Sequence, residues 1–293
     1  GIGWRALSKL QLERDSSTLG TELIAAPDAD NWRWATSATL QNQLLGTLDV
    51  TSQRLRGGRS QNGARIERNL FLQYDRAASV DSDSREPVIA QSVTANYAFS
   101  ARYYDRWPFP RAGWGWGAEL GGGSTLGSLP QAYARWLTRW QGFWRAGGAD
   151  VTQASAARVA LRAAAAAVLA KDSTSLPSTQ LFLAGGDNSV RGYALRSIGV
   201  TLADGSSTAG RYLLSGSVEW QQPLRWGGKL SAWEGTLFLD AGAVANQVAA
   251  LRPKAGLGVG ARWNSPVGPL QIDLAYGVDV RQWRLHMNLG FSF

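Results

Sequence analysis

The side chains that could do chemistry are few and of restricted types. The chain of 293 residues contains no Cys and one His, His286. The lack of Cys excludes a disulfide scaffold, a thiolate metal site and a Cys nucleophile. A single His leaves little room for a His-based zinc site or a relay of two imidazoles, and no G-x-S-x-G elbow supplies a Ser nucleophile. The sequence therefore predicts no metal, no cofactor and no enzymatic activity.

Other polar candidates carry weaker signals. Asp273 and Asp279 share one face of an alternating stretch, but six strand positions span roughly 20 Å, which is too far for a general acid/base pair. Gly185-Gly186 is a poor phosphate-binding loop, because neither a Lys-Ser/Thr pair nor a helical pattern follows it. His286 falls on a polar face, and we expect it to be a plain lining residue.

Arg191 is the most informative charged residue. It lies in the stretch Leu183-Ala-Gly-Gly-Asp-Asn-Ser-Val-Arg-Gly-Tyr193. A guanidinium has five donors in a planar fork and stays charged, so it can bind two carboxylates and hold a loop in place. Taken alone, however, the residue is better explained as a solvated loop position.

The elements that must position these residues alternate in polarity. From Trp283 to Phe293 every odd residue is apolar and every even residue is polar or Gly, as in a strand with one apolar and one wet face. Strands of soluble sandwiches have about 5–6 residues, whereas a tilted membrane strand needs ~9–11. The same alternation recurs, for example from Tyr212 to Gln221 and from Lys254 to Trp263.

The polar face of these strands holds Arg, Glu, Asp and Gly, and the other face holds Trp, Leu, Phe and Val. Strands in lipid must pair every backbone group, which demands a closed barrel, and Trp near strand ends suits the interfacial aromatic girdles. We therefore predict an all-β fold, a transmembrane antiparallel β-barrel of 14–16 strands. A large soluble all-β protein is the alternative. The net charge of +8 is spread over the chain, which favours acidic lipid headgroups or a basic lumen over nucleic acid.

Fourteen strands are expected. They fall near residues 3–13, 17–26, 31–42, 47–56, 63–75, 88–104, 112–121, 131–145, 156–170, 210–222, 232–244, 254–264, 269–279 and 283–293. Short turns are expected at 107–110 and 264–269, and longer loops at 56–62, 77–86 and 121–129, with short turns on one side of the barrel and long loops on the other. The Ala-rich stretch 154–171 could form a helix by propensity, but we favour a strand. Residues 171–210 lack clean alternation.

Val190-Arg191-Gly192-Tyr193, introduced by Gly185-Gly186-Asp187, resembles the signature loop of the BamA/TamA superfamily of outer-membrane insertases and transporters. The stretch Gly258–Asp273 is similar to that family's last hairpins, and Asp105–Gly113 to its periplasmic turn. The sequences of Gly185–Ser189 and of Ser265–Pro269 most resemble those of the TamA subfamily.

The resemblance implies a fold and a site. It implies that residues 171–210 fold back into the lumen and that Arg191 meets acidic side chains on the inner wall. Glu219 and Asp240 are the matching acids, although Phe238 interrupts the polar face that Asp240 shares. The resemblance also implies a seam between the first and last strands, with Gly290, Phe291 and Phe293 in its C-terminal strand. Gly290 could weaken that ladder or merely leave room for a lumenal neighbour.

From the resemblance we expect an outer-membrane protein of a Gram-negative bacterium that helps to insert or translocate proteins such as autotransporters. Residues 1–293 would form one transmembrane barrel domain, without the POTRA domains that the family carries ahead of its barrel. Expected partners are outer-membrane lipids and lipopolysaccharide, unfolded outer-membrane proteins and a TamB-like periplasmic protein, but no nucleic acid. The alternative is a two-partner secretion transporter or a passive channel.

Overall fold

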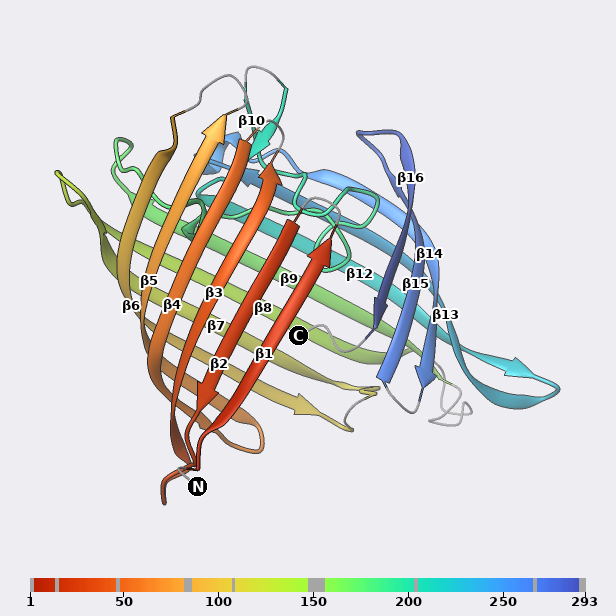
Figure 1. Cartoon of the computed structure of the whole chain (residues 1–293). Coiled ribbons are helices and arrows are strands. Elements are labelled where there is room, and N and C mark those ends of the chain that lie inside the picture. Colours follow the sequence, from red (N-terminus) through yellow and green to blue (C-terminus); the bar gives the residue numbers. More distant parts are fainter. Residues whose placement is uncertain are drawn as a thin grey trace.

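The alternating stretches form one antiparallel sheet that curls into a barrel (Figure 1). The computed structural model describes residues 3–13, 16–45, 48–81, 86–106, 109–146, 156–202, 205–265 and 268–289. The barrel strands are β1 Arg5–Glu13, β2 Ser16–Ile24, β3 Trp32–Leu45, β4 Leu48–Asn62, β5 Ile66–Asp81, β6 Val88–Tyr104, β7 Gly113–Leu126, β8 Ala132–Ala146, β9 Ala157–Ala170, β12 Tyr212–Trp226, β13 Lys229–Ala245, β14 Lys254–Ser265, β15 Gly268–Gly277 and β16 Gln282–Leu289.

Each barrel strand pairs with the next one along the chain, and β9 pairs with β12 across a long connection. These fourteen strands correspond in order to the fourteen predicted from alternation. The Ala-rich stretch is strand β9 rather than a helix, because both of its edges are paired, to β8 and to β12. Among the described residues, no helix is long and apolar enough to cross a membrane.

The apolar side chains point outward along the strands. In β16, Leu285 and Met287 are 64% and 60% exposed, whereas His286 between them is only 9% exposed. Exposed apolar side chains around the whole wall are the pattern of a surface that lipid covers. The alternation therefore places the apolar face outside and the polar face in the lumen, as predicted.

Most of the exposed Trp side chains lie toward the end of the barrel where β1 begins, whereas Trp136 and Trp283 lie toward the opposite end. The larger group flanks the hairpins of the β1 end, where Trp233 stacks on Trp263 with ring centroids 5.8 Å apart and Tyr103 packs on Trp114 at 4.8 Å. Further members of this group are Trp34, Trp116, Trp144 and Trp226. Such aromatic side chains favour the level of the lipid headgroups.

Three of the predicted longer loops are wrong. Residues 56–62 lie in β4, residues 77–81 in β5 and residues 121–126 in β7. Their polar side chains do not end the strands, because the ladder continues through them, for example from Arg56↔Gln73 to Asn62↔Glu67. We also expected short turns at one end of the barrel and several long loops at the other. Among the described segments, the one long connection is residues 171–211, between β9 and β12.

Most of this long connection lies within the barrel, and the part around residues 200–202 and 205–208 lies at the upper rim in Figure 1. It contains a short 3-10 turn, η1 (Ser178–Gln180), and a small hairpin of β10 (Val200–Thr201) and β11 (Ser207–Thr208). A second 3-10 turn, η2 (Val248–Ala250), follows β13. The connection, called the lumenal loop below, carries the conspicuous Val190–Tyr193 motif.

Candidate functional site in the barrel lumen

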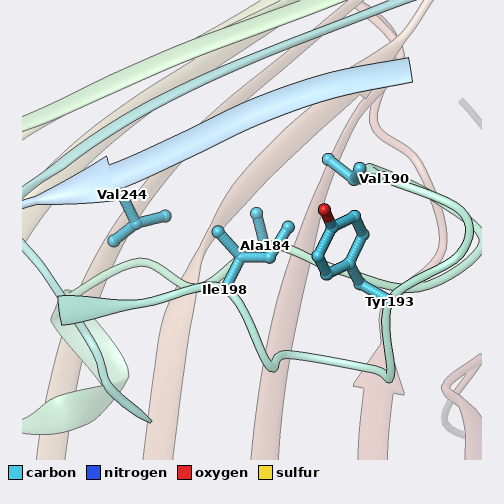
Figure 2. Packing of buried hydrophobic residues seen from close by; sticks show 5 residues of the cluster. All are labelled: Ala184, Val190, Tyr193, Ile198 and Val244. Carbon is cyan, nitrogen blue, oxygen red and sulfur yellow. The ribbon is translucent and has the colours of Figure 1, made fainter. Parts of the chain in front are cut away.

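The lumenal loop has its own small apolar core. Isolated bridges join Phe182 to Gly210 and Ala184 to Ile198, so the loop folds back on itself. Figure 2 shows Ala184, Val190, Tyr193 and Ile198 of the loop gathered along strand β13, whose Val244 lies on the Ile198 side of the group, and all five are buried. This packing closes the backbone around the motif and fixes where Arg191 must lie.

Arg191 is 1% exposed and is held mainly by Asp240 of β13. Its Nε and Nη2 atoms donate to Asp240 Oδ2 and Oδ1 at 2.7 and 2.9 Å, and its backbone N–H donates to Oδ2 at 3.0 Å. The fork of the guanidinium thus matches the two oxygens of one carboxylate, a geometry that Lys cannot copy.

Two further carboxylates complete the contacts of Arg191. Its Nη1 atom donates to Glu219 of β12 at 2.7 Å and to Asp273 of β15 at 2.9 Å. Burial alone would lower the pKa of Arg191, but the hydrogen bonds and charges of these three acids raise it above its ordinary value. The guanidinium therefore stays charged in a buried site.

A second arginine shares these acids. Arg262 of β14 donates to both oxygens of Glu219, at 3.0 and 2.9 Å, and also pairs with Asp273. Arg162 of β9 lies next to this group, and its Nη2 atom is 3.5 Å from Ser217 Oγ. Three guanidinium groups thus face three carboxylates, and this balance limits the desolvation cost of burying ions.

Phe238 occupies the position that interrupts the polar face of β13. Its ring lies under the guanidinium of Arg191, with Cζ 3.4 Å from the ring centroid. A guanidinium over an aromatic face gains a cation–π contact. The apolar exception in the polar pattern is therefore part of the Arg191 site.

Glycines on the inner face of β14 let the loop approach the wall. A Cβ added at Gly256 would lie 1.9 Å from the carbonyl oxygen of Arg191, and one at Gly258 would lie 2.5 Å from the Phe238 ring. Both distances are too short for real side chains, so these positions need Gly. On the loop, Gly192 has φ +92° and packs on the backbone of Gly277 in β15.

The loop is also bound to the last described strand. The backbone N–H of Gly192 donates to Nε2 of His286 in β16 at 3.0 Å, and Nδ1 of the same ring contacts the carboxylate of Asp187. Because Nε2 accepts a hydrogen bond, the proton of the neutral imidazole lies on Nδ1, toward Asp187. His286 therefore lines the lumen as expected, and it also links the loop to the strand, a role that the sequence did not predict.

Tyr193 closes the motif at the turn between β15 and β16. Its hydroxyl donates to Asp279 Oδ2 at 2.6 Å and accepts from the Asp279 backbone N–H at 3.1 Å. Burial and the hydrogen bond to Asp279 raise the pKa of Tyr193 to about 12.

The structure brings six of the predicted site residues together: Val190, Arg191, Gly192, Tyr193, Glu219 and Asp240. The predicted seam residues Gly290, Phe291 and Phe293 lie outside the described residues. Sequence reasoning missed Asp273, Arg262 and the His286–Asp187 contact. The inward parity of Asp273 was visible, but its depth follows from the pairing Gly260↔Asp273, which no local pattern encodes.

A polar cleft of about 920 Å³ lies between the first strands, the loop and β16. Its lining comes from both ends of the strand order, since β1 and β16 are the terminal strands of the pairing ladder. It includes Gln11, Ser16, Thr18, Gln41, Asp187, Asn188, Arg284, His286 and Asn288.

Comparison with known families identifies this architecture. The model of the Omp85 superfamily domain matches residues 11–293. The chain belongs to the Omp85 superfamily. Among solved structures, it is similar to BamA from Haemophilus ducreyi lacking POTRA domains 1–3, with a TM-score of 0.73 and 16% sequence identity over 98% of this chain.

The likeness to BamA at this identity concerns the fold, and the chain spans 63% of that BamA chain. Membership of the Omp85 superfamily makes this a Gram-negative outer-membrane β-barrel. The Arg191 site described above therefore lies in the lumen of an Omp85 barrel.

Proposed function

We propose that this Omp85 barrel is the membrane part of a TamA-like assembly factor that helps to insert or translocate outer-membrane proteins such as autotransporters. Its clients would be unfolded outer-membrane proteins, and its surroundings outer-membrane lipids and lipopolysaccharide. A TamB-like protein would be its periplasmic partner. The barrel would act without ATP and without a catalytic residue, because strand pairing supplies backbone hydrogen bonds to an incoming segment.

One observation carries the proposal: the lumen holds a loop fixed by a buried arginine. A passive channel needs an open lumen, and nothing in conduction requires three carboxylates on one guanidinium. Arg191 ties the loop to β12, β13 and β15, and Gly192 ties it to β16. These contacts fix the positions of β12, β13, β15 and the terminal strand β16 relative to the loop.

The cleft beside β16 supports the same proposal. It lies between the two terminal strands of the ladder and is lined by amide, hydroxyl and charged groups. Terminal strands offer backbone donors and acceptors to a further strand. A client strand pairing there would remain next to the fixed loop.

The experiment compares liposomes that contain this barrel with empty liposomes. An unfolded autotransporter barrel is added, and its insertion is followed by heat-dependent gel mobility and protease protection. We expect faster insertion with the barrel present, and slower insertion when Arg191→Gln releases the loop. Insertion at the rate of empty liposomes would contradict the proposal.

Planar-bilayer conductance distinguishes the channel alternative. The unaltered barrel is expected to give small, brief currents, and Arg191→Gln larger ones. A large steady pore in the unaltered protein would favour a channel or a two-partner secretion transporter.

A further inference from the structure

The lumenal loop also contacts the wall on the side away from Arg191. Gln180 of η1 is 2% exposed, and its Nε2 atom donates to Asp75 Oδ2 of β5 at 2.6 Å. Asp75 is fully buried and also accepts from Arg54 Nε of β4 at 2.9 Å. A carboxylate removed from water needs such partners, and one of them is supplied by the loop.

Two arginines bind the loop backbone at the same place. Arg54 Nη2 donates to the carbonyl oxygen of Thr179 at 2.9 Å, and Arg135 Nε of β8 donates to that of Gln180 at 3.2 Å. The Arg135 guanidinium also lies over the Phe182 ring, with Cζ 4.8 Å from its centroid. Phe182 in turn packs with Tyr133 and Val168 in an apolar cluster.

Asp75 lies far around the wall from Asp240 of the Arg191 site, although Arg135 of β8 and Glu219 of β12 have only β9 between them in the pairing order. Five strands, β6, β7, β8, β9 and β12, separate β5 from β13 in the pairing order. Along the loop, by contrast, Gln180 and Arg191 are close in sequence. The loop therefore runs between two parts of the wall, with charged groups holding it at each side.

We propose that Thr179 and Gln180 form a second attachment of the lumenal loop, with Asp75, Arg54 and Arg135 as its positioning residues. This attachment holds its end of the loop independently of Arg191. It links the β4–β8 part of the wall to the β12–β16 part, so that release of the Arg191 side opens the lumen only partly. The inference concerns the loop and does not depend on which clients the barrel serves.

Cysteine labelling in the full barrel tests this independence, because the chain has no Cys of its own. One reporter is Ser178→Cys beside the second attachment, and the other is Ala194→Cys beyond Arg191. Each is combined with Gln180→Leu or with Arg191→Gln in liposomes. The rate of reaction with a membrane-impermeant maleimide reports local release of the loop.

Loss of a hydrogen bond to a buried charge makes local opening roughly tenfold more frequent. We expect Gln180→Leu to raise labelling by about this factor at position 178 and to leave position 194 unchanged. Arg191→Gln should do the reverse. Asn69→Leu is the control. It also replaces an amide side chain by Leu on the inner face of β5, six residues from Asp75, and it should leave the labelling rates at positions 178 and 194 unchanged.

Bilayer conductance provides a second readout. With two independent attachments, the double variant Gln180→Leu/Arg191→Gln should open a larger pore than either single variant. Heat-dependent gel mobility shows that each variant retains a folded barrel, and isosteric Asp75→Asn replaces Gln180→Leu if that variant does not fold. The proposal is overturned if Arg191→Gln alone releases position 178, if both reporters respond to both changes, or if Gln180→Leu leaves position 178 unaffected.

Discussion

At the scale of single residues, the shape of the guanidinium matters as much as its charge. Arg191 reaches Asp240 with two nitrogens while Nη1 contacts Glu219 and Asp273. A Lys ammonium is a compact point charge and cannot cover these positions at once. The site is thus specific for Arg.

The first prediction concerns Arg191 itself. Arg191→Gln leaves three buried carboxylates short of one cation and should lower the free energy of unfolding by about 3–5 kcal/mol. Arg191→Lys keeps the charge but loses hydrogen bonds to charged groups, and should lower the free energy of unfolding by about 1.5–3 kcal/mol. Urea titration in lipid vesicles measures both.

Arg139→Gln is the control, because Arg139 is exposed on the lumenal face of β8. It should cost less than about 0.5 kcal/mol. Equal losses at positions 139 and 191 would mean that the acids around Arg191 do not stabilise the barrel.

Tyr193 gives the second prediction, a dependence of stability on pH. Its pKa is raised from 10.0 to about 12 by burial and by the hydrogen bond to Asp279. The folded state thus holds the proton more tightly than the unfolded state. The resulting stabilisation is complete below pH 10 and is lost as the pH rises through 12.

The measurement compares the unaltered protein with Tyr193→Phe in urea titrations at several pH values from 8 to above 12. The stability difference between the two should shrink across the upper part of this range. A difference that does not change with pH would show that the phenol proton does not contribute.

At the scale of the elements, close approach of the loop to β14 depends on small residues. A Cβ at Gly256 would lie 1.9 Å from the Arg191 carbonyl oxygen, whereas one at Gly216 of β12 finds its nearest atom at 3.8 Å. We predict that Gly256→Ala costs about 1–3 kcal/mol through overpacking, and that Gly216→Ala changes stability little. Trypsin cleavage after Arg191 and Arg196 should accelerate only in Gly256→Ala. Equal cleavage of the two variants would contradict this packing.

The elements differ in how far the sequence predicts them. Strand order and the facing of the side chains were predictable, because a period of two residues is local and recurs along much of the chain. The ends of the strands were not predictable, because polar residues such as Arg56 can continue the ladder when their side chains face a lumen that contains water.

The acids Glu219 and Asp240 of the site could be predicted from the family resemblance and from their position on the inward face. The contacts of Asp273 and His286 depend on register and on the path of an aperiodic loop, and no local pattern specifies either.

At the scale of the whole molecule, the outward apolar face is what a bilayer must cover. Leu237 lies midway along β13 and is 58% exposed, and Leu224 lies near the hairpin end of β12. We predict that Leu237→Arg costs about 2–4 kcal/mol, and that Leu224→Arg costs about 0–1 kcal/mol because it is near the interface. Folding equilibria in vesicles measure both. Similar small costs at the two positions would argue against a lipid-facing wall.

The placement of the Arg191 acids on late strands has a consequence for biogenesis. Asp273 lies 82 residues beyond Arg191 along the chain, and β12, β13 and β15 must all be in register before its three acceptors converge. Contacts of such long sequence separation form slowly. We therefore expect docking of Arg191 to be a late event of folding, and a nascent barrel whose last hairpins are unpaired to leak ions until that event occurs.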